Sequence, residues 1–258
     1  ASMPDAALVF AGFAVGLIVG LTGVGGGSLM TPVLIFFFGV KAHLAVGTDL
    51  LFAAFTKLGG TVGLARRRMV PWNVVGLLCA GSIPAALGAL WVLRHLGPES
   101  ERVQHLMTTT LGAALLLTAA STLYKALAFS PKRQAAEQAR RSQAGADADR
   151  PRHWSLPVLL GALIGTLVTF TSVGAGAIGV TVLLLVFPHL PLPRIIAADI
   201  AYAVPLTLVA GLGHASLGSV DWSLLAQLLA GSLPGIWLGS RLVARTPERL
   251  IRSGLSLL

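Results

Sequence analysis

The stretch "LTGVGGGSLMTP", residues 21–32, interrupts the first apolar run of the chain with three consecutive glycines. A glycine inside a helix costs about 1 kcal/mol relative to alanine, so Gly25, Gly26 and Gly27 predict a break in helical structure. Strongly apolar segments flank the break on both sides, at 6–20 and 28–39. The fold must therefore accommodate non-helical backbone in the most apolar part of the chain.

The composition is that of a membrane protein. The chain has 258 residues, of which 55% are hydrophobic and 11% charged, and its mean hydropathy is +0.80. Soluble domains carry about 25% charged residues, so we predict an all-α, multi-pass protein of the cell membrane, the inner membrane in a bacterium. The net charge of +9 would also suit a nucleic-acid-binding protein. The basic residues, however, gather in short connections between apolar segments, so we expect no nucleic-acid partner.

The apolar segments form two repeats. Residues 16–38 align with 165–187, and residues 44–94 align with 194–244. The matched positions include residue types that chance similarity between apolar helices would not pair: Asp49 with Asp199, Trp72 with Trp222, Gly81 with Gly231, Ser82 with Ser232 and Pro84 with Pro234. We predict a first repeat at 1–129, a cytoplasmic linker at 130–153, and a second repeat at 154–258 whose last helix is incomplete.

Charge in matching loops differs between the two repeats. Loop 65–69 carries three arginines, whereas its counterpart at 214–221 carries none. Connection 94–102 has balanced charges, whereas its counterpart at 241–252 carries four arginines and one glutamate. Because basic loops face the cytoplasm, the two repeats are predicted to be inverted relative to each other.

This topology leaves each repeat with a re-entrant helical hairpin followed by three transmembrane helices. The two arms of each hairpin have about 12–15 residues and span about 18–22 Å, which is less than the roughly 30 Å hydrocarbon core. The hairpins would enter from opposite faces. Their tips, at 22–28 and 171–177, would then lie near the middle of the membrane.

The tips carry the candidate substrate site. Irregular backbone at this depth is tolerated where protein or a water-filled cavity supplies hydrogen bonds, and a half-helix that begins after the glycines directs free N–H groups toward the tip. Two converging tips would bind a small anion. The predicted substrate-binding residues are Thr22, Gly25, Gly26, Gly27, Ser28, Thr171, Ser172, Gly174 and Gly176. The alternative is that these small residues only let helices pack closely.

Three charged residues lie within apolar segments and are candidates for coupling or gating. Asp49 and Asp199 are repeat mates, and an intramembrane carboxylate is a functional candidate, here for proton coupling. Alternatively, each acid lies near the start of a helix only because the helix dipole stabilises a carboxylate there. Lys57 could hold an anion or could extend to the inner interface. Its repeat mate is Thr207, so the repeat does not support a ligand role.

Motifs of other chemistries are missing from the sequence. It has no Walker sequence, nucleophile elbow or H-E-x-x-H motif, and Cys79 is the single cysteine. We therefore predict no enzyme activity, no metal site and no cofactor.

Six stretches resemble the sulfite exporter TauE/SafE family. They are "GLTGVGGGSLMTPVL", "AVGTDLLFAAFTKLGG", "AGSIPAALGA", "TSVGAGAIGV", "IIAADIAYAVPLTLVAGLGH" and "GSLPGIWLGS". The resemblance covers essentially the whole chain and implies a permease for sulfur oxyanions or organosulfonates, such as sulfite or sulfoacetate. In the second tip Ala175 replaces a glycine and Ala177 the serine, so the two half-sites are expected to be unequal.

The predicted function is secondary transport of a small anion by alternating access, with membrane lipid as surroundings and protons as a candidate coupling ion. An anion channel of the same fold is one alternative. An intramembrane enzyme is another, although the sequence offers no nucleophile–base pair.

Overall fold

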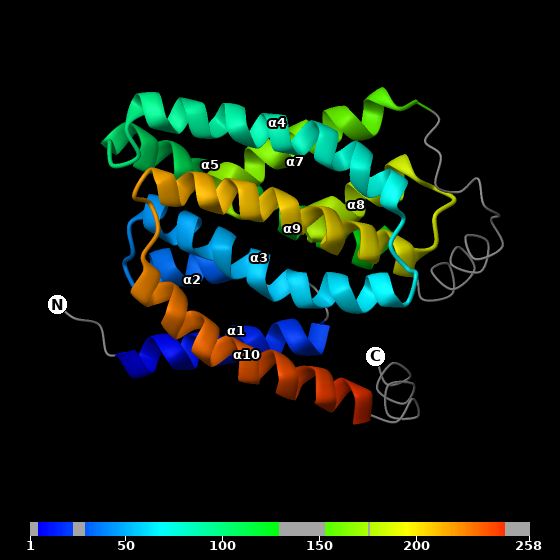
Figure 1. The fold of residues 1–258 in the computed structure, drawn as a ribbon, viewed down its shortest axis with the longest axis horizontal. Helices are drawn as coiled ribbons and strands as arrows, with labels where there is room; N and C mark the ends of the chain where they lie inside the picture. Colours follow the sequence, from blue (N-terminus) through cyan, green and yellow to red (C-terminus); the bar gives the residue numbers. More distant parts are fainter. Residues whose placement is uncertain (1–4, 23–28, 129–152, 175, 246–258) are drawn as a thin grey trace. The chain divides into compact units, whose positions relative to one another are not determined.

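The computed structural model describes residues 5–22, 29–128, 153–174 and 176–245. Every regular element in these ranges is a helix, which confirms the predicted all-α class (Figure 1). The helices are α1 (Asp5–Thr22), α2 (Met30–Phe36), α3 (Ala42–Arg66), α4 (Trp72–Leu96), α5 (Glu101–Ala128), α7 (Ser155–Thr171), α8 (Ala177–Val186), α9 (Leu192–Ser216) and α10 (Trp222–Arg245).

Helix lengths follow from the apolar segments of the sequence. Three described helices, α4, α9 and the Glu101–Leu123 part of α5, are long and apolar enough to cross a membrane. A helix of 25 residues such as α4 is about 37 Å long at 1.5 Å per residue, which exceeds the hydrocarbon core. By contrast, α2 and α8 have 7 and 10 residues, too few to cross it. Each repeat thus contains one short helix, as the predicted hairpins require.

The helices divide into two compact units. One contains α1 and α10, and the other spans residues 27–221 and contains the remaining seven described helices. Neither unit coincides with a sequence repeat, because each takes helices from both. Residues 129–152, most of the predicted linker, and residues 246–258, the predicted incomplete helix, lie outside the described residues.

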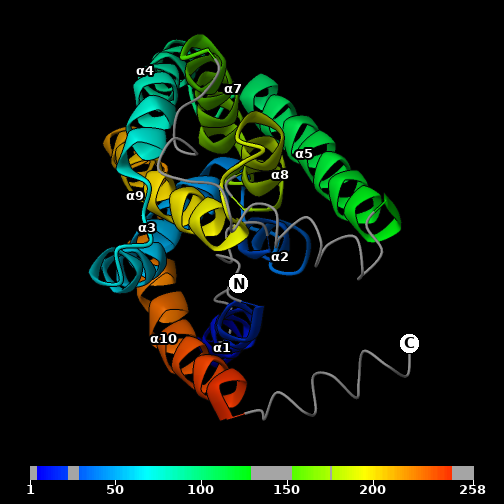
Figure 2. The same ribbon diagram turned by 90° about the vertical axis from the view of Figure 1, so that its right-hand side faces the viewer.

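In the larger unit, the equivalent helices α3 and α9 pack against each other in opposite directions (Figure 1). Gly47, near the start of α3, touches Ser219, just after the end of α9. At the other end, a side chain built on Gly60 would lie 3.7 Å from Ile200 in the first half of α9. Figure 2 shows α5, α7 and α9 surrounding the short helix α8, which contacts all three.

Close backbone contacts join α4 to α7. A side chain on Gly161 would approach the Leu78 carbonyl oxygen to 2.5 Å, and one on Gly165 would overlap the Ser82 carbonyl oxygen. In return, Gly81 faces the carbonyl oxygen of Val158 with no room for a Cβ. Small residues thus bring these two helices into direct backbone contact.

The smaller unit repeats this arrangement. On α1, a side chain on Gly12 would lie 2.6 Å from the Leu228 carbonyl oxygen of α10, and one on Gly16 would overlap the Ser232 carbonyl oxygen. Gly231 of α10 in turn faces the Val9 carbonyl oxygen. These residues are the repeat mates of those that join α7 to α4. The same contact therefore occurs twice. Each time, the first helix of one repeat (α1 or α7) packs against the fourth helix of the other repeat (α10 or α4).

Candidate functional site

The second hairpin breaks between α7 and α8, as the sequence predicts. Helix α7 ends at Thr171, and the next residue, Ser172, adopts a left-handed conformation with φ 59°. The Ser172 N–H donates to the Val168 carbonyl at 2.7 Å. The Thr171 hydroxyl donates to the Leu167 carbonyl at 2.7 Å and accepts the Val173 N–H at 3.0 Å. Side-chain and backbone groups thus satisfy the end of α7 within the protein.

Two glycines then turn the chain into α8. Gly174 and Gly176 have φ values of +140° and +126°, which side chains with a Cβ rarely adopt. The Gly179 N–H donates to the Gly174 carbonyl at 2.9 Å, and the Val180 N–H donates to the Gly176 carbonyl at 2.8 Å. Glycine is therefore required by the backbone at both predicted tip positions.

The break is buried. Thr171 is 0% exposed and Ser172 is 4% exposed. Among the described residues, the hydroxyl oxygen of Ser172 makes no hydrogen bond. A buried polar group without a partner is uncommon in native proteins. The tip therefore presents an unused hydrogen-bonding group beside an interrupted helix.

Asp49 on α3 lies at this tip. It is 0% exposed, and its Oδ2 accepts both the N–H of Thr31 at 3.2 Å and the Thr31 hydroxyl at 2.5 Å. The Ser172 hydroxyl faces the same carboxylate. Oδ1 of Asp49 has no hydrogen bond within the described part of the chain. The site thus joins the second tip to α3 and to the short helix α2 of the first repeat.

Asp199 on α9 occupies the equivalent position in the second repeat. It is 3% exposed and lies against Gly179 of α8, where a Cβ would overlap the Asp199 Oδ1. The Tyr202 hydroxyl lies 3.1 Å from the same Cβ position. Each acid therefore faces the short helix of its own repeat. Neither acid is in the first turn of its helix, where the helix dipole acts most strongly.

Lys57 is buried within the same region. It is 4% exposed, and the charges that act on it are Asp199 first and Asp49 second. A lysine that extends to the membrane interface keeps its ammonium in water, and this degree of burial does not fit that alternative. Asp49, Lys57 and Asp199 form what we call the charged cluster, defined by these three residues.

The first tip is only partly described. Thr22 is the last residue of α1, and its side chain is outside the described residues, as are Gly25, Gly26, Gly27 and Ser28. The predicted contribution of these residues to substrate binding therefore stays a prediction, as does the meeting of the two tips.

Several polar contacts were not anticipated from the sequence. Thr31, which donates twice to Asp49, gives no signal in the sequence apart from its place in an apolar segment. Tyr202 follows Asp199 by three residues and so shares its helix face, and its buried hydroxyl makes no hydrogen bond within the described residues. Gln104 of α5 accepts the Ala42 N–H at 2.9 Å and also contacts His43, which ties α5 to the start of α3. These contacts join segments far apart in the chain.

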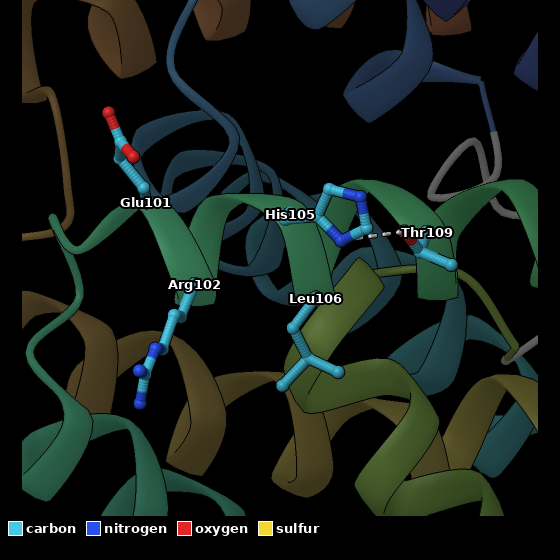
Figure 3. Close-up of a pocket in the computed structure, with 5 residues that line it drawn as sticks. All are labelled: Glu101, Arg102, His105, Leu106 and Thr109. Carbon is cyan, nitrogen blue, oxygen red and sulfur yellow. Dashed lines mark hydrogen bonds between the residues drawn. The ribbon is translucent and has the colours of Figure 1, made fainter.

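A shallow surface depression lies away from these residues on a single helix. Its lining comes from α5 alone: Glu101, Arg102, His105, Leu106 and Thr109 (Figure 3). His105 and Thr109 are linked by a hydrogen bond of 3.4 Å. None of the predicted site residues is among them. Within the described ranges, no group of three or more His, Cys, Asp or Glu side chains could hold a metal ion.

Comparison with known proteins identifies the family. The family model described as "Sulfite exporter TauE/SafE" matches residues 8–258. The chain belongs to the sulfite exporter TauE/SafE family. The match of the family model over nearly the whole chain agrees with the resemblance seen in the sequence. Family membership and the long apolar helices together show that the chain is a helical membrane protein.

Relatives cover almost the full length of this TauE/SafE chain. The "Probable membrane transporter protein YjnA" of Bacillus subtilis (strain 168) is 35% identical over 94% of the chain and 91% of its own length. YdhB and YunE of the same organism, also named probable membrane transporter proteins, are 24% and 27% identical over 95% and 94% of the chain and 93% and 88% of their own lengths. No solved structure is a significant match.

Proposed function

We propose that this protein is a secondary transporter of a small anion, specifically a sulfur oxyanion or organosulfonate such as sulfite or sulfoacetate. Family membership and the names of the relatives support transport across a membrane. The observation that carries the anion site is the buried break between α7 and α8 with the unpartnered Ser172 hydroxyl. Helix α8 begins there, and N–H groups at a helix start favour negative charge.

The proposal includes two inverted repeats that exchange access to the site. Two observations support it: the equivalent helices α3 and α9 are antiparallel, and the contact of α7 with α4 recurs between α1 and α10. Transporters with inverted repeats bind substrate near the midplane at broken helices. Movement of one group of helices relative to the rest would expose the second tip first to one side of the membrane and then to the other.

The substrate class is tested with the purified protein in liposomes. We expect saturable uptake of at least one of sulfite, sulfate, thiosulfate, sulfoacetate and taurine, because a small set of N–H and hydroxyl donors fits an oxyanion. Empty liposomes and the Ser172→Ala variant serve as controls, and Ser172→Ala should weaken apparent affinity several-fold. Flux that does not saturate would favour a channel, and no flux with any of the five compounds would contradict the proposed substrate class.

The inverted arrangement is tested by cysteine labelling. Arg66→Cys and Ser216→Cys place single thiols at the exposed last residues of the equivalent helices α3 and α9, in a background where the native Cys79 is replaced by alanine. We expect a membrane-impermeant reagent added outside intact cells to label position 216 and spare position 66, because the arginine-rich loop at 65–69 faces the cytoplasm. Labelling of both positions from one side would indicate parallel repeats instead.

A further inference from the structure

The hydroxyl of Tyr202 on α9 is buried without a hydrogen bond. Tyr202 is 0% exposed, and its hydroxyl oxygen has no partner in the described part of the chain. A buried tyrosine hydroxyl usually finds a partner, because a polar group that is left without one loses its contact with water and gains nothing in return. The hydroxyl therefore needs an explanation beyond the packing of the ring.

The first repeat shows that an aromatic ring can pack at this position without a hydroxyl. Phe52 on α3 is the repeat mate of Tyr202 and is 1% exposed. The short helices differ in the same sense, because Met30 on α2 is matched by Gly179 on α8. Met30 is 0% exposed, so the first repeat has two buried apolar side chains where the second has a glycine and a tyrosine. Packing thus accounts for the ring but not for its hydroxyl.

The Tyr202 hydroxyl lies at the first turn of α8, next to the second tip. It is 3.1 Å from the position that a Cβ would take on Gly179, the third residue of α8. The N–H groups of Gly179 and Val180 already donate to the carbonyls of Gly174 and Gly176. An anion at the start of α8 therefore meets fewer free N–H groups than the four that a helix start usually presents, and side chains must supply the other donors.

Two hydroxyls from different elements can supply these donors. Ser172 lies on the segment that leads into α8, is 4% exposed, and has a hydroxyl without a partner among the described residues. Tyr202 approaches the first turn of the same helix from α9. At neutral pH each hydroxyl carries a proton that it can donate. Both side chains are thus placed to bind an oxyanion held at the start of α8.

We infer that the Tyr202 hydroxyl donates a hydrogen bond to the transported anion at the start of α8 and helps to select ligands that have an oxygen acceptor there. A site with a buried donor rejects ligands that cannot accept from it, because the donor then stays unpaired. The contact belongs to the second repeat alone, since Phe52 has no hydroxyl to donate. The identity of the ligand rests on the proposed function.

Binding of sulfite and of sulfoacetate to the purified full-length protein tests this contact. We expect Tyr202→Phe to bind at least one of them about tenfold more weakly than the wild type, because hydrogen bonds to charged groups are the stronger ones. Thr166→Val on α7 is the matched control: the Thr166 hydroxyl donates to the Ala162 carbonyl of its own helix on an exposed face, so its removal should leave affinity unchanged. Wild-type affinity in Tyr202→Phe would overturn the inference and leave the proposed function intact. Failure of the wild type to bind either compound would instead contradict the proposed substrate.

The stability of the ligand-free protein tests whether the hydroxyl has a structural role. Tyr202→Phe should melt no lower than the wild type, because it removes an unpartnered polar atom from a buried position. Phe52→Tyr is the reciprocal variant and should melt lower, because it adds a polar atom to a buried apolar position. A lower melting temperature for Tyr202→Phe would show that the hydroxyl is bonded within the protein, and this result would overturn the inference whatever the substrate.

A vibrational signal of the tyrosine shows whether the contact is direct. The chain has two tyrosines, Tyr124 and Tyr202, so Tyr124→Phe leaves Tyr202 as the single reporter. In protein made with isotope-labelled tyrosine, we expect the phenol C–O band in infrared difference spectra to shift when sulfite or sulfoacetate is added, because this band depends on the hydrogen bonds of the hydroxyl. An unshifted band, even with weaker binding by Tyr202→Phe, would overturn the direct contact.

Discussion

Gly81→Leu is expected to destabilise the protein by at least about 2 kcal/mol, because a side chain there has no space to enter. A Cβ on Gly81 would overlap the Val158 carbonyl oxygen of α7 and lie 2.9 Å from the Ala162 nitrogen. Both neighbours are backbone atoms, so relief requires the two helices to separate. The measurement is thermal unfolding of the purified protein in detergent.

Gly88→Leu on the same helix is the matched control. Gly88 is exposed, and a Cβ there would meet nothing within 4 Å, so the variant should gain about 1 kcal/mol from its higher helix propensity. Gly231→Leu, the repeat mate on α10, should match Gly81→Leu, because Gly231 faces the Val9 backbone of α1 in the same way. Equal stability of Gly81→Leu and Gly88→Leu would refute the close packing of α4 and α7.

The sequence was sufficient to predict the helices and the break in the second hairpin. The expected segments 44–65 and 73–93 differ by at most three residues at either end from α3 and α4, because apolar stretches bounded by charged or turn residues define membrane helices. The tip at 171–177 was predicted because its small residues suit non-helical backbone, and Gly174 and Gly176 have the positive φ values that only glycine readily adopts.

The pairing of helices could not be predicted in this way. The two repeats align Ser82 with Ser232, but nothing in either segment indicates that Ser82 touches Gly165 of the other repeat. Thr31 likewise gave no sign that it would donate to Asp49. Such contacts depend on which helix faces meet after folding, and an all-apolar helix has no polar stripe that marks its partner.

The position of Lys57 shows the same limitation for the site. One lysine eight residues before an arginine-rich loop fits interfacial placement as well as burial, because its long side chain can reach several ångströms in either direction. Burial became evident only from the packing of α3 against α9, which places Lys57 where both Asp49 and Asp199 act on it. The sequence alone therefore could not place Lys57 beside the two acids, and the tertiary structure was needed to do so.

Gly179→Ala is expected to lower the rate of transport by at least about tenfold, because it displaces Asp199 from the charged cluster. The added methyl group would overlap the Asp199 Oδ1 and lie 3.1 Å from the Tyr202 hydroxyl. Asp199 is 3% exposed, so its carboxylate cannot turn into water. Its movement away from Lys57 leaves a buried ammonium less well compensated, which is strongly unfavourable.

Gly112→Ala on α5 is the matched control for this substitution. It adds the same methyl group to a helical glycine where a Cβ meets nothing within 4 Å, so transport should be retained and stability should rise slightly. The measurement is the initial rate of uptake into liposomes, for whichever sulfur compound the wild type transports, at equal amounts of folded protein. Wild-type uptake by Gly179→Ala would show that Asp199 does not need its place beside α8, and that the charged cluster is not part of the transport mechanism.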